Sequence, residues 1–292
     1  MLVAFCFAGA KVRRFFESTK YLAQFFMKIC VFSKNMTKFA GMKGILYNIC
    51  IAVLALTATS CQGQTKYEIP AKLKDRPEQI LQRKGYTASY NRDTKTPNWV
   101  AWHLTADHTK GRHQRKEEIF SEDTSVKAPR ATNWDYYNSR YDRGHMCPAG
   151  DNKWDKQTMT ESFLFTNICP QNHGLNKYEW NDIEMKCREW ARKYGAIDIV
   201  CGPIFDKSGA EQKTIGKNKV WVPTRFFKVI LCRKGEPKAI GFIYRNEGKK
   251  QLIEDAVKTV DEVERITGID FFPALDDKIE RKVEANASLK DW

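Results

Sequence analysis

Alternation of apolar and polar side chains predicts a series of short β-strands along the chain. Residues 86–90 and 99–104 alternate in this way, while later segments are short runs rich in β-branched and aromatic residues. Each segment has the length of one strand and is bounded by polar or turn-forming residues. The predicted strands are residues 86–90, 99–104, 163–168, 196–201, 226–231 and 238–244.

Spacing typical of amphipathic helices occurs twice. In residues 177–193 the apolar side chains recur at helical intervals, and Gly195 provides a stop. Residues 252–267 repeat the pattern and end at Gly268. The long charged segment 105–138 lacks periodicity, and such a loop in a compact domain is more often functional than idle. Because strands and helices mix without regular β–α–β alternation, the sequence predicts an α+β fold with a largely antiparallel central sheet and flanking helices.

The N-terminal segment has the pattern of a targeting sequence. Lys43 follows Met42, residues 45–58 are almost entirely apolar, and small residues then lead to Cys61. This apolar run is shorter than the roughly 20 residues that a membrane span needs. Residues 42–61 are therefore predicted to be a signal peptide, with an uncleaved anchor as the alternative.

The end of that segment, LTATSC, resembles a bacterial lipoprotein signal, in which Cys61 would carry the lipid as the first mature residue. We therefore expect an exported protein, either anchored to the membrane at the periplasmic or outer cell surface or secreted. If Met42 is the true start, residues 1–41 are an upstream extension. Residues 62–85 are polar with two prolines and are predicted to be a linker that could hold one short helix. One folded domain is expected over residues 86–292.

Composition and charge favour a folded protein with an anionic partner. Hydrophobic residues make up 42% of the chain, and eight tryptophans argue for a packed core. The net charge is +14, but residues 1–61 hold eight basic residues and one acidic residue, so 41 basic and 34 acidic residues leave +7 for the rest. This excess favours a polyanion such as nucleic acid, although a generic basic secreted protein would have the same charge.

The cysteines do not form a zinc motif. Of nine cysteines, four lie within the first 61 residues, and the other five have no paired CxxC spacing. An exported protein could oxidise some of these five, and the odd number would leave at least one thiol unpaired within the chain. The five are Cys147, Cys169, Cys187, Cys201 and Cys232.

The segment 141–184 gathers the side chains that phosphodiester hydrolysis requires. His145 can accept a proton from water near neutral pH. Arg143 is a permanent cation that can bind phosphate oxygens, and Gly144 would allow the backbone to approach a ligand closely. Asn176 offers a neutral oxygen of the kind that Mg²⁺ binds. Glu184 lies eight residues after Asn176 along a predicted helix, so the side chains of Asn176, Trp180 and Glu184 would share one broad face. Glu184 could then reach a water bound to the metal.

Each of these residues also has a plain structural interpretation. His145 could be a core histidine, Asn176 a helix N-cap, and Glu184 an ordinary exposed glutamate. The other histidines are expected to lie in strands or loops without a chemical role, although His173 is only three residues before Asn176.

Three segments in this order and spacing carry a family resemblance. Asp142–Arg143–Gly144–His145 stands as DRGH with Pro148 after it, and Thr166–Gln171 reads TNICPQ. The third segment is LNxxxW followed by an acid, formed by Leu175, Asn176, Trp180 and Glu184. Together they resemble the DNA/RNA non-specific endonucleases with a ββα-metal finger, whose corresponding motifs are DRGH, SNxxPQ and LNxxxW…E. The upstream NWVA strand at residues 98–101 and the closing TGIDFFPAL extend the resemblance over roughly residues 86–275.

The resemblance implies an activity and a role for each motif residue. It implies Mg²⁺-dependent hydrolysis of DNA and RNA to 5′-phosphate products, with Mn²⁺ able to substitute. His145 would be the general base and Asn176 the direct metal ligand. Glu184 would act on the metal through water, and Asn167 would position His145 or a water of the metal. Arg143 would hold phosphate.

Other implied features stay open at the level of sequence. The family places an arginine after the NWVA strand; Arg115 fits best and Arg112 is the rival. If the two finger strands pair, Cys147 and Cys169 could come close enough for a disulfide. The sequence does not determine the oligomeric state, and a homodimer is one of the alternatives. A surface nucleic-acid-binding lipoprotein without catalysis, and a phosphodiesterase for small or lipid substrates, are the competing functions.

Overall fold

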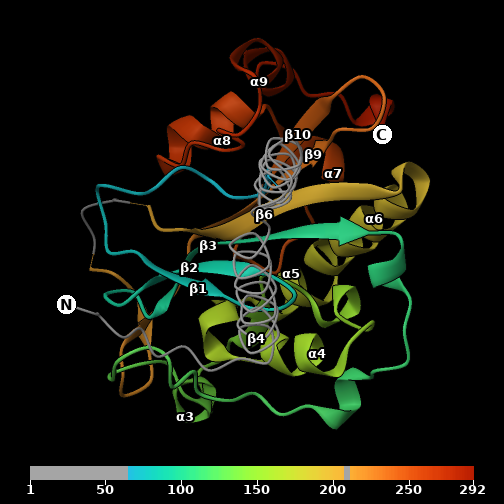
Figure 1. The fold of residues 1–292 in the computed structure, drawn as a ribbon. Helices are drawn as coiled ribbons and strands as arrows, with labels where there is room; N and C mark the ends of the chain where they lie inside the picture. The colour runs from blue at the N-terminus through green and yellow to red at the C-terminus, as the bar shows by residue number, and fades with distance from the viewer. Residues whose placement is uncertain (1–64, 207–210) are drawn as a thin grey trace, which may run out of the picture. The chain divides into compact units, whose positions relative to one another are not determined.

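The structure is a computed structural model that describes residues 65–206 and 211–292 (Figure 1). Its centre is a seven-stranded sheet in the order β1-β2-β3-β6-β9-β10-β11, in which every neighbouring pair is antiparallel. These strands are β1 (Gln79–Gln82), β2 (Thr87–Asn91), β3 (Thr96–Thr105), β6 (Ala196–Ile204), β9 (Arg225–Cys232), β10 (Lys238–Arg245) and β11 (Val257–Lys258).

Two small antiparallel pairs and several helices complete the fold. The pairs are β4 (Asp142–His145) with β5 (Ile168–Gln171), and β7 (Thr214–Ile215) with β8 (Val220–Trp221). The α-helices are α3 (Asn133–Tyr136), α4 (Lys156–Ser162), α5 (His173–Lys177), α6 (Glu179–Tyr194), α7 (Ile253–Ala256), α8 (Val260–Thr267) and α9 (Asp277–Glu284). Short 3-10 turns lie at Asp107–Thr109, Arg115–Glu117, Ala149–Asp151, Phe165–Asn167 and Leu289–Asp291.

Both faces of the sheet are buried, because successive side chains of a strand point to opposite faces. In β3, Val100 and Trp102 pack into one hydrophobic core with the apolar side of α6, while Trp99 and Ala101 pack into a second core with α8 and α9. Figure 1 shows α8 and α9 at one side of the sheet and the β4 segment with α4 and α5 at the other. The α+β fold with an antiparallel central sheet is therefore confirmed.

Five of the six predicted strands lie where the sequence pattern placed them, as β2, β3, β6, β9 and β10. The strand predicted at 163–168 is wrong. Phe165–Asn167 forms a 3-10 turn, with all three residues buried, and β5 begins only at Ile168. Consecutive burial in a turn gives an apolar run that resembles a strand in sequence.

The first predicted helix, residues 177–193, corresponds to α6, which begins at Glu179 and is followed by Gly195 (φ 87°). A break at Tyr178 (φ −112°, ψ −90°) separates α6 from α5, so Asn176 and Glu184 lie on two helices and not along one as predicted. The second is wrong as one helix, because β11 separates α7 from α8. Thr259 starts α8 through a reciprocal capping box with Glu262, in which the backbone N–H of each residue donates to the other's side chain. Gly268, in the left-handed region at φ 68°, ends α8 as predicted.

Residues 65–85 are not a linker. The compact unit begins at Thr65, Leu73 is buried in the core that contains Trp99, and Gln79–Gln82 forms strand β1 instead of a helix. The segment is polar because β1 is an edge strand with exposed side chains, so its composition resembles that of a tether.

The predicted targeting segment, residues 42–61 with Cys61, and the extension at residues 1–41 lie outside the described residues. Within residues 65–206 and 211–292, none of the helices is both long and apolar enough to cross a membrane. The five cysteines of this part are buried free thiols. The finger strands β4 and β5 pair, but no disulfide joins Cys147 and Cys169.

The burial of Leu73 gives a test of the corrected domain boundary. Leu73→Ala should lower the free energy of unfolding by about 2–5 kcal/mol, because it leaves a cavity beside Trp99. Ile80→Ala, at a position 46% exposed in β1, should cost less than about 1 kcal/mol. Urea denaturation measures both, and equal small effects would place Leu73 outside the folded core.

Candidate active site

The antiparallel pair β4–β5 and the helices that follow it form a strand–strand–helix unit beside the main sheet. Gly144 lies opposite Cys169 in this pair, and a Cβ there would lie only 2.2 Å from Oε1 of Gln171. This contact within the protein is by itself a reason for glycine at position 144, whether or not a ligand also approaches the backbone there.

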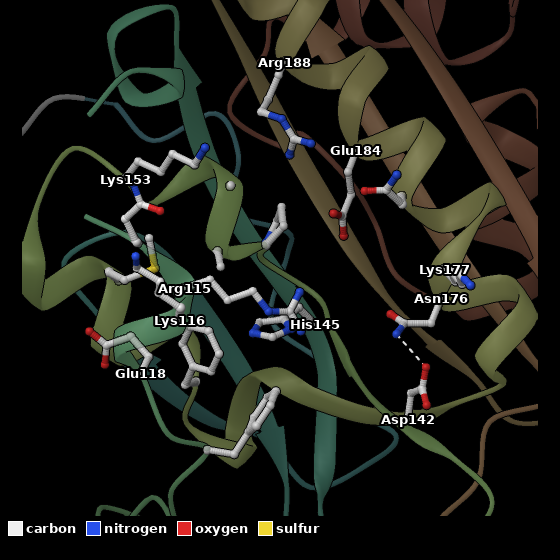
Figure 2. A pocket seen from close by; sticks show the side chains of 18 of the residues that line it. Arg115, Lys116, Glu118, Asp142, His145, Lys153, Asn176, Lys177, Glu184 and Arg188 are labelled. Atoms are coloured by element: carbon white, nitrogen blue, oxygen red, sulfur yellow. Dashed lines mark hydrogen bonds between the residues drawn. The ribbon is translucent and has the colours of Figure 1, made fainter. Parts of the chain in front are cut away.

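A cleft of about 930 Å³ opens next to this unit (Figure 2). Its walls come from the loop around Arg115, from β4, from the turn after Pro148, and from α5 and α6. Figure 2 shows His145 and Arg115 on one side and Asn176, Glu184 and Arg188 on the other, projecting toward the same space. Three of the predicted residues, His145, Asn176 and Glu184, thus converge although 39 positions separate the first from the last.

His145 is held in a mostly aromatic pocket. Its side chain is 6% exposed and lies edge-on to Phe163, with ring centroids 4.8 Å apart, and 5.3 Å from Phe120. Burial, with a smaller contribution from the charge of Arg115, lowers the pKa of His145 to about 3. The imidazole is therefore neutral at physiological pH and able to accept a proton. Its backbone carbonyl accepts a hydrogen bond of 3.1 Å from the Trp180 indole.

Asn176 is oriented by a carboxylate. Its Nδ2 donates to Oδ2 of Asp142 at 2.9 Å, which leaves the amide oxygen directed into the cleft (Figure 2). Nδ1 of His173 lies 2.9 Å from the same oxygen of Asp142. The N-cap of α5 is Asn172, whose side chain accepts from the Gly174 N–H. Asn176 is therefore not the cap, and its side chain is available to a ligand.

Glu184 is half-buried on α6, one turn after the buried Trp180. Burial raises the pKa of its carboxyl to about 7, against the lowering effect of the Lys228 and Arg188 charges. Among the described residues, no hydrogen bond or ion pair reaches this carboxylate. Glu184 is thus an acid kept in the cleft without a protein partner, and not an ordinary exposed helix residue.

Two cationic side chains of the site, Arg188 in the wall of the cleft and the buried Lys228, are not predicted from the sequence. Arg188 pairs with Asp151 at 3.0 Å, and Asp151 also accepts from the Trp102 indole at 3.1 Å. Lys228 is fully buried, with Nζ 4.4 Å from the ring centroid of Trp180. Two sequence signals could have found them: Arg188 is four residues after Glu184 on the same helix, and Lys228 interrupts an apolar strand.

The two candidate arginines near the NWVA strand differ in position. Arg115 lines the cleft from the turn Arg115–Glu117, whereas Arg112 is exposed and not among the lining residues. Arg143 does not line the cleft either. Its Nε donates to Oδ1 of Asn133 at 2.8 Å, and its guanidinium lies 5.5 Å from the ring centroid of Tyr136. Of these three arginines, Arg115 is therefore the one that lines the cleft, while the Arg143 guanidinium lies 5.7 Å from the ring centroid of Phe120 in its wall.

Asn167 has a different position from the one expected. It is fully buried, and its side chain bonds only to backbone: Oδ1 accepts from the Cys147 N–H, and Nδ2 donates to the carbonyls of Cys147 and Ser162, all at 2.8–2.9 Å. The amide has no remaining contact with the His145 ring or the cleft. Asn167 instead fixes the backbone that leaves β4 directly after His145.

The donors in the cleft fit a hard divalent cation. The free oxygen of Asn176 and the unpartnered carboxylate of Glu184 project into one space, and oxygen ligands are those that Mg²⁺ and Mn²⁺ prefer. A strand–strand–helix unit that presents a buried histidine and an asparagine oxygen to one cleft is the arrangement of a ββα-metal nuclease.

The chain belongs to the DNA/RNA non-specific endonuclease family, whose profile matches residues 65–278. It is 38% identical over 216 residues to the mitochondrial nuclease EXOG of Danio rerio, covering 68% of this chain and 63% of that protein. It is 33% identical over 209 residues to mitochondrial endonuclease G of Homo sapiens, covering 68% of this chain and 70% of that one. The matched part is therefore less than two thirds of the EXOG relative's length.

The fold is also found in a solved structure. The chain in the crystal structure of the EndoG/EndoGI complex superimposes with a TM-score of 0.66 at 29% identity, covering 73% of this chain and 91% of that one. The family match begins at residue 65, which agrees with the start of the compact unit and not with the predicted boundary at residue 86.

The bonding of Asn167 gives a test of its structural role. Asn167→Ala should lower the free energy of unfolding by about 3 kcal/mol, because it leaves the buried Cys147 N–H and two carbonyls without partners. Asn286→Ala, which removes one bond at an exposed residue, should change it by less than about 1 kcal/mol. Chemical denaturation followed by tryptophan fluorescence measures both, and an Asn167→Ala protein of wild-type stability would contradict this role.

Proposed function

We propose that this protein is a Mg²⁺-dependent endonuclease that hydrolyses phosphodiester bonds of DNA and RNA and leaves 5′-phosphate products. The observation that carries the proposal is the convergence of His145, Asn176 and Glu184 on one cleft that Arg115 also lines. Membership of the non-specific endonuclease family supports it.

In the proposed reaction, His145 accepts the proton of the attacking water. Its burial among aromatic rings keeps the imidazole neutral, and the Trp180 bond to its carbonyl fixes the strand that carries it. A pKa of about 3 makes the free imidazole a weak base. A negatively charged phosphate in the cleft would offset the Arg115 charge, which contributes to this low value.

Asn176 and Glu184 would hold the metal, Asn176 through its amide oxygen and Glu184 through water. When bound there, Mg²⁺ or Mn²⁺ supplies positive charge that stabilises the charge developing on the phosphate and on the leaving oxygen. Asp142 orients the amide of Asn176 by accepting from its Nδ2. The raised pKa of Glu184 fits this assignment, because a nearby cation favours the ionised carboxylate.

Substrate binding would be carried by cationic side chains around the cleft. Arg115 lines the cleft and its charge acts on His145, and Lys116, Lys153, Lys177 and Arg188 also line the walls (Figure 2). Contacts of this kind recognise the phosphate backbone, so weak sequence preference and binding that weakens with salt are expected.

The targeting pattern supports a proposed export. We propose that the chain is cleaved directly before Cys61 and that Cys61 becomes a lipid-bearing N-terminus, so that the nuclease acts at the cell surface or in the periplasm. Mass spectrometry of the mature N-terminus would show a lipid-modified Cys61; an unprocessed Met1 or Met42 would refute this processing.

A plasmid digest tests the catalytic proposal. His145→Ala should lower the cleavage rate with Mg²⁺ by at least about 10²-fold, because it removes the group proposed to accept the proton of the attacking water. Binding to the same DNA in EDTA should change little. The matched control, His113→Ala, removes a histidine that does not line the cleft and should cleave as the wild type does.

Two outcomes would contradict the proposal. Near-normal cleavage by His145→Ala would remove His145 as the base. DNA retention without cleavage by the wild type in Mg²⁺ or Mn²⁺ would favour a nucleic-acid-binding lipoprotein. The alternative of a phosphodiesterase for small or lipid substrates is tested by letting a small model diester compete with the plasmid. Only such a phosphodiesterase would prefer the diester.

A further inference from the structure

A group of carboxylates lies between α8 and α9, at the side of the sheet away from the cleft region (Figure 1). Asp261 and Glu264 are one turn apart on α8, and Glu284 is the last residue of α9. One carboxylate oxygen from each of the three lies within 4.8 Å of the others. These residues are far from the catalytic motifs in sequence and belong to the C-terminal helices.

Glu284 is the unusual member of the group. It is 6% exposed, and its Oε1 is buried without a hydrogen-bond partner among the described residues. A buried carboxylate with a free oxygen costs several kcal/mol unless a charge or a proton compensates it. Its position next to two further acids makes that cost larger.

No basic side chain of the described residues compensates this group. None of the ion pairs of residues 65–206 and 211–292 involves Asp261, Glu264 or Glu284. Within the described part of the chain, the one hydrogen-bond donor to the group is the Phe271 N–H, which bonds to Oε1 of Glu264 at 2.7 Å. Glu280 and Asp270 add further negative charge nearby.

Burial and the neighbouring acids together raise the pKa of Glu284 to about 9 and that of Glu264 to about 7. For Glu284 the neighbours that contribute, Glu264, Glu280, Asp261 and Asp270, are all acidic. A cation among these oxygens would remove this repulsion.

We propose that Asp261, Glu264 and Glu284 form a binding site for a hard divalent cation of the Ca²⁺ class, which joins α8 to α9. The donors are all carboxylate oxygens, which suit Ca²⁺, and the site holds no imidazole or thiolate of the kind that zinc prefers. Ca²⁺ also accepts irregular coordination, whereas Mg²⁺ requires a near-octahedral one.

The site is structural and independent of the proposed nuclease activity. The side chains of α8 and α9 that pack on the sheet include Val260, Val263 and Val283, adjacent in sequence to the three acids. Neutralising the acids would let both helices pack on the sheet without mutual repulsion. Bound Ca²⁺ is therefore expected to stabilise the folded protein without changing the cleft.

The test separates this site from the cleft by working in an Asn176→Ala background. Ca²⁺ at about 100 times its dissociation constant should raise the Tm of that protein by about 5 °C or more over EDTA. Equilibrium dialysis with elemental analysis should find one bound Ca²⁺ per chain. Adding Asp261→Asn or Glu284→Gln should abolish both the shift and the bound ion.

Asp277→Asn is the matched control, because it removes an exposed acid at the other end of α9 and should retain the Ca²⁺ response. Asp261 is exposed, so its substitution should fold even if Glu284→Gln does not. In an otherwise wild-type chain, Asp261→Asn should cleave plasmid normally at saturating Mg²⁺. A Tm that Ca²⁺ leaves unchanged in the Asn176→Ala protein, or a shift that survives Asp261→Asn, would overturn the proposal and indicate that protons alone neutralise the acids.

Discussion

The hydrogen bond from the Trp180 indole to the carbonyl of His145 is the contact on which the candidate site depends. Strand β4 belongs to a two-stranded pair outside the main sheet, and such a pair has little stability by itself. Trp180 lies in the core formed by α6 and the sheet and is 1% exposed. Its indole therefore ties the strand that carries His145 to the hydrophobic core between α6 and the main sheet.

Hydrogen bonds from other side chains likewise hold the remaining groups of the cleft in position. Asn167 fixes the backbone after His145 from the opposite side, and Asp142 fixes the amide of Asn176. Lys228 lies beneath Trp180, so a buried cation is held under the helix that carries Glu184. Side chains that touch no substrate thus determine where the proposed base and metal ligands lie.

The elements that the sequence predicted well carry a regular apolar spacing or a run of β-branched and aromatic residues. Helix α6 and strand β3 were identified from such spacing, and strand β9 from such a run. Two errors came from local chemistry that overrides periodicity. The Thr259–Glu262 capping box starts a new helix inside an apolar pattern, and the buried turn at Phe165–Asn167 imitates a strand. A third, the supposed linker, came from polarity at a sheet edge that composition cannot distinguish from a tether.

The sequence by itself determined the family and the α+β fold and proposed His145, Asn176 and Glu184 as site residues, because residue types at fixed spacing are properties of the chain. Only the tertiary structure decided which side chains surround these three residues in the cleft. Arg143 is adjacent to the motif histidine yet faces Asn133 and Tyr136, while Arg115, 30 positions before His145, lines the cleft. The reason is that a side chain's direction and its burial depend on packing between segments distant in sequence, and no local pattern records that packing.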